Sequence, residues 1–345
     1  MKGNSKIWRL AKGIIKAIEK FNLNLTDKVV LTEAATGNYV VTPVIAAVAG
    51  VKKVYAFTKD SVYGSMEKVK KETNSLAKIL NVEDKVFIIN SFGDVDFESL
   101  DIVTNTGFLR PVTRDLIEKL PCKCVIPLMY EPWEFRRGEI DLEACYEKGV
   151  KVYGTNEGDE RLRTMEYIGF VVLYLLLENK YSPFSSKVLL MGCKKFVDPT
   201  SHILVQNGYA VEEFVDYNAR LNPKIYDAIV ILEHKKDVLL IGDKPEAFID
   251  KDEIREDTLV IHICGNVDFN NARFKFVPQN IKPFGYMSIT TDFMDPQAVI
   301  DLHTAGLKVA EGMLKANELG LKGLEYKLFM EKNYPALAFD SPQFW

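Results

Sequence analysis

The chain has 345 residues, of which 47% are apolar and 27% are charged, and its formal net charge is −4. This length exceeds what one hydrophobic core usually serves, so two domains are expected. The small negative charge gives no electrostatic reason to expect nucleic acid or an anionic membrane as a partner. The five cysteines include no CxxC pair, a usage typical of a reduced, intracellular protein, and we therefore expect a cytoplasmic chain.

Neither a secretory signal nor a membrane span is predicted. Residues 1–21 form a basic amphipathic helix pattern without a long apolar core or a small-residue cleavage site, which excludes a secretory signal. The longest apolar run, 167–177, is much too short to cross a bilayer.

Strands and helices are predicted to alternate along the chain, which is typical of α/β proteins with doubly wound, mostly parallel sheets. The first domain, 1–160 with the tail 320–345, is expected to be flavodoxin-like and to bind the substrate. The second, 161–319, is expected to be Rossmann-like and of the dinucleotide-binding type. The aromatic tail is expected to pack on the first domain or on a second protomer. The expected strands are 29–32, 54–58, 85–90, 101–106, 124–129, 150–155, 188–191, 211–215, 228–233, 258–264 and 274–277, and the main helices are 40–49, 65–80, 113–120, 142–148, 161–179, 199–207 and 296–319.

The stretch from Lys187 to Asp216 has the outline of half a dinucleotide-binding unit. A buried strand ends at Gly192, a helix is predicted to begin with Asp198 as N-cap and Pro199 at its first position, and a second strand ends near Asp216. An acid at this spacing is suited to the adenine ribose and favours NAD over NADP. The glycine fingerprint is damaged, because Lys194 and Val197 occupy its second and third glycine positions. The predicted cofactor-binding residues are Gly192, Cys193, Lys194, Lys195, Asp216, Cys264 and Gly265.

Several segments, in the expected order, resemble the D-2-hydroxyacid dehydrogenase superfamily, also known as the formate/glycerate dehydrogenase fold. They are Asp101–Leu116, Ile140–Val150, Thr155–Glu157 and Thr164–Phe170, and the similarity spans roughly residues 100–315. The resemblance implies two α/β domains with a cleft between them, a homodimer, and NAD(H) on the second domain.

The catalytic residues of that superfamily do not carry over to this chain. Its arginine would fall in the segment 261–266, and its acid–base histidine in 282–286, and neither segment contains that residue at the matching position. Hydride transfer to a 2-keto acid requires a cation at the carbonyl and a proton donor beside it. The sequence therefore predicts an oxidoreductase with altered chemistry.

Two segments are candidates for holding a substrate, which we expect to be small and anionic. The loop 129–138 gathers aromatic rings, two carboxylates and two arginines where the family has a short glycine loop. The alternative role of this loop is an interdomain or dimer contact. The segment 105–110 follows a strand at its carboxyl edge, the usual side for ligands. The predicted substrate-binding residues are Asn105, Thr106, Gly107, Arg110, Tyr130, Glu131, Trp133, Arg136 and Arg137.

A second nucleotide loop is possible at Thr36, Gly37, Asn38 and Tyr39, which lie between a strand and a helix N-terminus, with Glu33 before them. This loop resembles that of S-adenosylmethionine-dependent methyltransferases. A tight turn that lets the next helix approach the sheet is the other interpretation.

The candidate catalytic residues are Glu131 and Glu134, which can act as acid or base when partly buried, and His262, the one histidine expected to face the cleft. A satisfied core histidine is the alternative for His262. No metal site is predicted, because the spacings of metal-ligating residue types do not match helix or ribbon geometry.

Three functions remain open on the sequence alone. The first is an NAD(P)-dependent oxidoreductase of the D-2-hydroxyacid dehydrogenase type with non-standard catalytic residues. The second is a non-catalytic small-molecule-binding or assembly protein that has lost the cofactor. The third is an enzyme that uses S-adenosylmethionine or another adenosyl ligand, either a methyltransferase or an enzyme like adenosylhomocysteine hydrolase.

Overall fold

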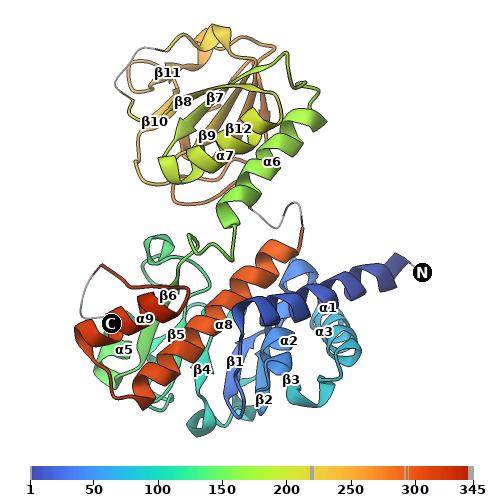
Figure 1. The fold of residues 1–345 in the computed structure, drawn as a ribbon, viewed down its shortest axis with the longest axis vertical. Coiled ribbons are helices and arrows are strands. Elements are labelled where there is room, and N and C mark those ends of the chain that lie inside the picture. The colour runs from blue at the N-terminus through green and yellow to red at the C-terminus, as the bar shows by residue number, and fades with distance from the viewer. Residues whose placement is uncertain (1, 218–220, 291–292, 294, 341–345) are drawn as a thin grey trace. The chain divides into compact units, whose positions relative to one another are not determined.

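The computed structural model describes residues 2–217, 221–290, 293 and 295–340, and the chain divides into two compact units (Figure 1). Unit 1 contains residues 1–162 and 296–345, and unit 2 contains residues 163–295. The chain therefore leaves unit 1, builds unit 2 and returns to unit 1.

Unit 1 is built on a seven-stranded sheet with the order β15-β6-β5-β4-β1-β2-β3. Strands β1 to β6 are parallel to their neighbours, and β15 pairs antiparallel with β6 at the edge. The strands are β1 (Val29–Glu33), β2 (Lys53–Phe57), β3 (Val86–Ile89), β4 (Ile102–Val103), β5 (Val125–Pro127), β6 (Lys151–Thr155) and β15 (Ala336–Leu337).

Both faces of this sheet are covered, because side chains of a strand point alternately to opposite faces. Val30 belongs to one apolar core, whereas Val29 and Leu31 belong to the other. The first core includes residues of α1 (Lys2–Phe21), α2 (Val41–Val48), α3 (Met66–Ile79), α8 (Gln297–Glu318) and α9 (Gly323–Asn333), and the second those of α4 (Arg114–Ile117) and α5 (Leu142–Lys148). Helices α1 and α8 lie side by side (Figure 1).

The sheet of unit 1 contains the expected flavodoxin-like strand order and one further parallel strand. Strands β2-β1-β4-β5-β6 follow the flavodoxin-like order 2-1-3-4-5, and β3 adds a parallel strand beside β2. The six parallel strands thereby have the order 3-2-1-4-5-6 of dinucleotide-binding sheets. The strand order of unit 1 reverses between β1 and β4. In sheets of this kind, ligands bind at the point of reversal.

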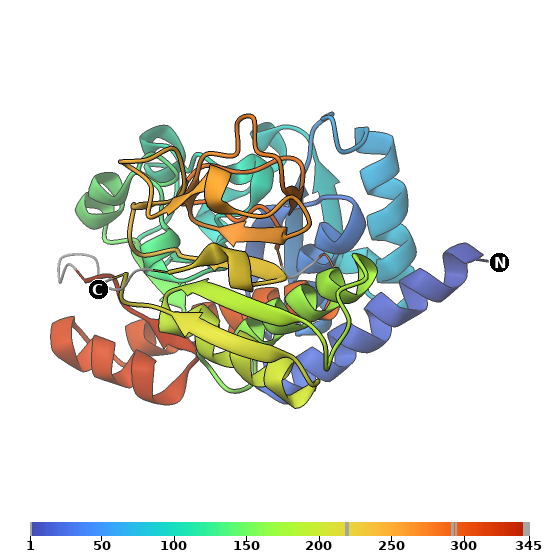
Figure 2. The ribbon, with the colours of Figure 1, turned by 90° about the horizontal axis from the view of Figure 1, so that it is seen from above.

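Unit 2 is built on a five-stranded parallel sheet with the order β14-β12-β9-β7-β8. Figure 1 labels β7, β8, β9 and β12 of this sheet, and Figure 2 shows the ribbon from above. Its strands are β7 (Lys187–Gly192), β8 (Ala210–Phe214), β9 (Ala228–Leu232), β12 (Leu259–Cys264) and β14 (Lys275–Val277). A separate three-stranded sheet contains β10 (Leu239–Gly242), β11 (Ile249–Asp250) and β13 (Asn266–Val267).

The two faces of the unit 2 sheet have different covers. Helices α6 (Thr164–Glu178) and α7 (Lys194–Gln206) pack on one face. On the other face the described residues supply the small sheet and aromatic side chains such as Phe248 and Phe269, where a doubly wound domain would place helices. The α/β class and the mostly parallel sheets are confirmed, and the helices on both faces are found in unit 1.

Helix α7 begins earlier than its sequence signals predict. Asp198 is not the N-cap; Cys193 is, and Pro199 lies inside the helix. Phe196 and Val197 are buried in the core under α7. Their burial favours extending the helix toward its N-terminus, although Pro199 removes one backbone donor.

The second domain boundary differs from the expected one, because residues 296–319 are expected in the second domain, whereas α8 packs in unit 1. The first boundary lies at Leu162. The tail packs on unit 1 through α9 and β15, and its residues 341–345 lie outside the described part of the chain.

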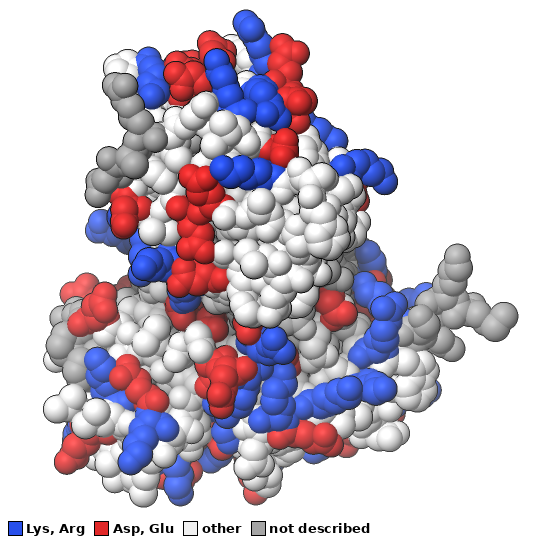
Figure 3. Space-filling model, turned by 45° about the horizontal axis from the view of Figure 1, so that its top comes forward, with Lys and Arg blue, Asp and Glu red and all other residues white. Residues whose placement is uncertain are grey.

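Short 3-10 helices connect several of these elements. They are η1 (Gly37–Val40), η2 (Glu83–Lys85), η3 (Phe92–Asp94), η4 (Phe97–Ser99), η5 (Gly107–Leu109), η6 (Pro132–Glu134), η7 (Pro223–Ile225) and η8 (Lys251–Glu253). Among the described residues, no helix has both the length and the apolarity needed to cross a bilayer. On the face shown in Figure 3, basic and acidic side chains are interspersed, in keeping with the small net charge.

Candidate functional site

A cavity of about 520 Å³ lies within unit 1 at the carboxyl edge of its parallel sheet. It is lined by residues that follow β1, β2, β4 and β5, together with two residues of α8. The lining residues are Glu33, Ala35, Thr36, Tyr39, Ser61, Tyr63, Gly64, Val69, Asn105, Thr106, Gly107, Phe108, Arg110, Met129, Tyr130, Leu302 and His303. The cavity therefore lies where the strand order reverses between β1 and β4, the expected ligand position in an open parallel sheet.

Glu33 ends β1 and lies against the loop that follows β4. Its Oε1 accepts a hydrogen bond from the backbone N–H of Phe108 at 3.3 Å. A Cβ on Gly107 would lie 1.7 Å from the same Oε1, so only glycine permits this approach. Burial raises the pKa of the Glu33 carboxyl, and the Phe108 amide and Arg110 oppose that rise. Glu33 thus retains its proton to a higher pH than an exposed glutamate.

Asn105 and Tyr130 form a directed hydrogen-bond chain. The Tyr130 hydroxyl donates to Glu139 Oε2, and its oxygen accepts from Asn105 Nδ2 at 2.7 Å. Asn105 Oδ1 is therefore turned away from Tyr130, and it is buried without a hydrogen-bond partner among the described residues. A buried acceptor of this kind needs a donor. Because Asn105 lines the cavity, a ligand N–H or O–H is suited to supply it.

Arg110 places a guanidinium at the cavity, and it is held by an ion pair with Glu139 at 3.1 Å. The same Glu139 oxygen is paired with Arg136 at 3.5 Å. Arg110 is about one-third exposed, so it remains accessible to a ligand. Planar guanidinium groups bind carboxylates and phosphates in bidentate fashion.

His303 reaches the cavity from α8, which returns to unit 1 after unit 2. Its Nδ1 is hydrogen-bonded to Thr42 Oγ1 at 2.5 Å. Burial, and secondarily the charge of Arg110, lowers the pKa of His303 to about 4. The imidazole is therefore neutral near pH 7.

Not all of the predicted substrate-binding residues lie at this cavity. Its lining includes five of them, namely Asn105, Thr106, Gly107, Arg110 and Tyr130. It does not include Trp133, Arg136, Arg137 or the candidate acids Glu131 and Glu134.

Glu131 has a structural role in the loop after β5. It is buried, accepts from Trp133 Nε1 at 2.5 Å and accepts from the backbone N–H of Glu157 at 3.0 Å. These bonds hold the loop against the end of β6, and both acceptor oxygens of Glu131 are engaged. Glu131 is therefore engaged in holding the loop and is not among the residues that line the cavity.

The possible second nucleotide loop contributes Thr36 and Tyr39 to the same cavity. Gly37 and Asn38 lie beside them in η1, and the Gly37 N–H donates to Glu72 Oε2 at 3.2 Å. The two predicted binding segments of unit 1 thus lie around one site.

The predicted cofactor edge of unit 2 does not fit a dinucleotide bound in the usual way. The backbone of Gly192 packs so closely on β9 that a Cβ at this position would lie 2.2 Å from the carbonyl oxygen of Leu232. Lys194 carries a side chain at the first turn of α7, where close backbone approach to a pyrophosphate is needed. Glu233 adds a buried carboxylate at this edge, which is hydrogen-bonded to Tyr217 and to the backbone of Lys235. A negative charge there opposes a pyrophosphate.

The other predicted cofactor residues surround this edge. Lys195 follows Lys194 in α7, Asp216 is exposed after β8, and Cys264 ends β12 beside Gly265. The backbone N–H of Glu233 donates to the Cys264 carbonyl at 3.0 Å, so Cys264 is part of the interstrand ladder.

The prediction that His262 faces a cleft is wrong. Its side chain is fully buried, Nδ1 is hydrogen-bonded to Ser288 Oγ at 2.8 Å, and Nε2 to the Gly265 carbonyl at 3.1 Å. Burial lowers the pKa of His262. His262 is therefore a core histidine with both ring nitrogens hydrogen-bonded, which is the alternative given in the sequence analysis.

Comparisons with known proteins are limited to structure. No family model and no curated protein matches the chain. The chain is similar to one of the subunits of dipicolinate synthase from Bacillus halodurans, with 13% identity over 85% of this chain and 98% of that one, and a TM-score of 0.53. It also resembles a 2-hydroxyacid dehydrogenase from Ketogulonicigenium vulgare Y25 (12% identity, 86% and 96% covered, TM-score 0.41) and an NAD⁺-bound 3-phosphoglycerate dehydrogenase from Entamoeba histolytica (11% identity, 86% and 97% covered, TM-score 0.42).

These similarities concern the fold. The similarity to the dipicolinate synthase subunit covers 85% of this chain and supports the predicted α/β fold. Sequence identities of 11–13% say nothing of the reaction.

Proposed function

We propose that this chain is an enzyme that acts on a small anionic molecule in the unit 1 cavity. The observation that carries the proposal is the grouping of Glu33, His303 and Arg110 around one cavity at the switch point of a parallel sheet. Perturbed titratable groups beside a cation are typical of sites for acid–base chemistry.

Each residue has a distinct part in this proposal. Arg110 binds the anionic group of the substrate, and Asn105 Oδ1 accepts from a substrate N–H or O–H. Glu33, with its raised pKa, donates or accepts a proton, since a carboxyl that titrates closer to neutral pH is a better general acid or base. His303 is neutral and can exchange a proton on the ring nitrogen that Thr42 does not engage.

The redox class of the reaction is a hypothesis based on the sequence resemblance. NAD is the first cofactor to test, although the unit 2 edge lacks the usual glycine cradle and carries Glu233. We derive no hydride step from this structure. The substrate-holding role expected of Arg136 and Arg137 passes to Arg110, because Arg110 lines the cavity.

An adenosyl ligand in unit 1 is the second candidate. Thr36 and Tyr39 line the cavity, and the sheet has the strand order of nucleotide-binding units. This candidate differs from the first in the ligand and shares its site.

A thermal-shift titration of the full chain tests the proposal. The ligands are small carboxylates and phosphates that bear hydroxyl or amino groups, with NAD⁺, NADH, NADPH and S-adenosylmethionine as further arms. A ligand at a hundred times its dissociation constant adds about 2.7 kcal/mol of stability. We expect at least one small anion to raise the melting temperature of the wild type.

The matched variants are Arg110→Ala and Arg137→Ala. Arg137 is exposed and is not among the cavity-lining residues, so its removal should leave binding unchanged, whereas Arg110→Ala should abolish the shift. Loss of binding in Arg137→Ala alone would refute the assignment of the site. Glu33→Gln should bind the same ligand but turn it over at least about a hundredfold more slowly, the usual contribution of one acid–base group.

A further inference from the structure

Unit 2 contains a thiol and an imidazole in direct contact, outside the cavity described above. Cys193 Sγ lies 2.7 Å from His234 Nδ1. Cys193 immediately follows β7, and His234 comes two residues after the neighbouring strand β9. Adjacent parallel strands end at the same edge of the sheet, so this topology fixes the pair.

The imidazole is held in place by its surroundings. His234 is buried, with 8% of its surface exposed, and its ring packs on Phe196 of α7 at a centroid distance of 4.5 Å. Cys193 is partly exposed. A small reagent can thus reach the sulfur, while the base beside it is shielded.

Some groups around the Cys193 sulfur raise the pKa of its thiol, and others lower it. Burial raises the pKa of the Cys193 thiol, and Glu233 adds to that rise. The backbone N–H groups of Phe196 and His234 and the charge of Lys235 oppose it. Tyr217, whose hydroxyl donates to Glu233 Oε2 at 2.5 Å, also lies near the sulfur, and Cys264 is close to Tyr217.

An internal disulfide is not available to Cys193 at this edge. Cys264 ends β12, and β9 lies between β12 and β7. Two strand spacings separate the chain positions by about 10 Å, which exceeds the span that a disulfide bridges. A disulfide between Cys193 and Cys264 is therefore excluded.

We propose that Cys193 and His234 form a nucleophilic thiol–imidazole pair that exchanges with low-molecular-weight disulfides. The Sγ–H proton passes to His234 Nδ1, which requires the neutral tautomer with its proton on Nε2. Sγ then attacks one sulfur of the disulfide, a new S–S bond forms, and the original S–S bond breaks. The leaving thiolate takes the proton from the imidazolium, so Cys193 is oxidised to a mixed disulfide and one equivalent of small thiol is released.

The mixed disulfide would lie at the N-terminus of α7, beside Gly192. The proposal concerns unit 2 alone and does not depend on the function of the unit 1 cavity.

The test uses the full-length chain in a Cys122→Ser background, which removes the exposed cysteine Cys122. The probes are 5,5′-dithiobis(2-nitrobenzoate) for the rate and oxidised glutathione for the adduct, which peptide mass mapping locates. We expect one thiol per chain, Cys193, to react at pH 7 at least about tenfold faster than Cys122 does in a second chain that carries Cys193→Ser and retains Cys122. His234→Gln should lower the Cys193 rate at least about tenfold.

His202→Gln is the matched control, because His202 is exposed on α7 of the same unit, and it should leave the rate unchanged. Equal rates for Cys193 and Cys122, or an unchanged rate in a folded His234→Gln chain, would overturn the proposal. Should His234→Gln fail to fold, the pH profile of the rate measured on the Cys122→Ser chain decides. A base-assisted thiol levels off above about pH 7.5, where imidazole is neutral, whereas an unassisted thiol continues to gain reactivity toward pH 9.

Discussion

At the scale of single residues, the unit 1 cavity holds two titratable groups that burial affects in opposite directions. Burial raises the pKa of Glu33 and lowers that of His303 to about 4. At a pH between the pKa values of Glu33 in the unfolded and the folded chain, the folded state therefore keeps the Glu33 proton and the unfolded chain has lost it. Glu33 thus lowers the free energy of unfolding as pH rises above its pKa in the unfolded chain. For His303 the unfolded state binds the extra proton, so the free energy of unfolding decreases as pH falls below the pKa of the unfolded histidine.

His303→Gln should flatten the acid limb of the stability curve. The pKa of this histidine is about 6.5 in the unfolded chain and about 4 in the folded chain. As pH falls from 6.5 to 4, the free energy of unfolding therefore decreases by up to about 3 kcal/mol. Denaturant unfolding at pH 7 and pH 4.5 should show a smaller difference for His303→Gln than for the wild type. His202→Gln, at an exposed site, should keep the wild-type difference. An equally large difference in His303→Gln would show that the acid limb has another origin.

At the scale of elements, the sequence predicts features that depend on local signals. Asn105, Arg110 and Tyr130 were found because they follow strands, and a parallel sheet brings strand ends to one edge. His303 and the supporting Glu139 were missed. His303 lies on a helix that returns to unit 1 from a distant part of the sequence, and Glu139 is defined by its contacts with Tyr130 and Arg110.

Two misassignments have physical causes of the same kind. Glu131 and Trp133 have the composition of a binding loop, yet they bond to each other and to the end of β6. Asp198 and Pro199 are a strong helix-start signal, but the burial of Phe196 in the core outweighs it. Tertiary packing decides both cases, and the local sequence does not contain it.

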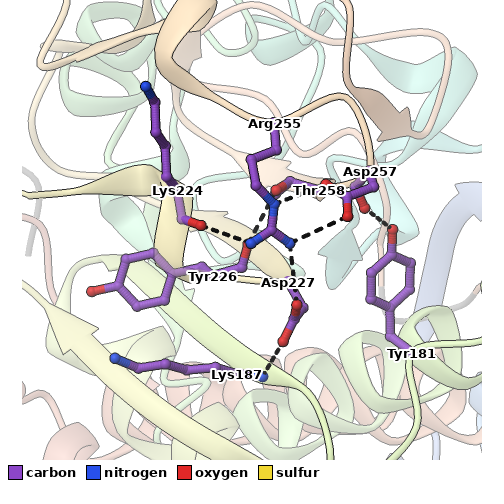
Figure 4. Close-up of polar contacts among 8 residues, drawn as sticks. All are labelled: Tyr181, Lys187, Lys224, Tyr226, Asp227, Arg255, Asp257 and Thr258. Atoms are coloured by element: carbon purple, nitrogen blue, oxygen red, sulfur yellow. Dashed lines mark hydrogen bonds and ion pairs between the residues drawn. The ribbon is translucent and has the colours of Figure 1, made fainter.

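The amino edge of the unit 2 sheet is fixed by Arg255 (Figure 4). Its guanidinium donates to the Lys224 carbonyl at 2.7 Å, to Asp227 Oδ1 at 3.2 Å and to Asp257 Oδ1 at 2.8 Å. Asp227 Oδ2 in turn accepts from the backbone N–H of Lys187, where β7 begins. One side chain thus links the starts of three adjacent strands, at the edge opposite to Cys193.

Arg255→Ala should destabilise unit 2 by about 1–2 kcal/mol, because the pairs are partly exposed and their charges are partly screened. Arg273→Ala, at an exposed site, should change stability by less than about 0.5 kcal/mol. Chemical denaturation monitored by amide hydrogen exchange separates unit 2 from unit 1. Ligand binding in unit 1 should be unaffected, and equal stability of the two variants would contradict the assigned role of Arg255.

At the scale of the whole molecule, each unit has a parallel sheet with its own apolar cores. In unit 1 the carboxyl edge carries a cavity with a buried acceptor and a guanidinium, and burial shifts the pKa values of its residues Glu33, Tyr130 and His303. In unit 2 the corresponding edge engages its own Glu233, Tyr217 and His234 in hydrogen bonds. We therefore propose that unit 1 binds the substrate, and the sequence resemblance implies a separate cofactor site in unit 2.

Amide hydrogen exchange of the full chain, with and without the ligand found in the titration, tests this assignment most directly. We predict increased protection in 33–39 and 105–110, with 192–197 and 213–217 unchanged. Protection confined to 192–197 and 213–217 would place the ligand on unit 2 and contradict the assignment.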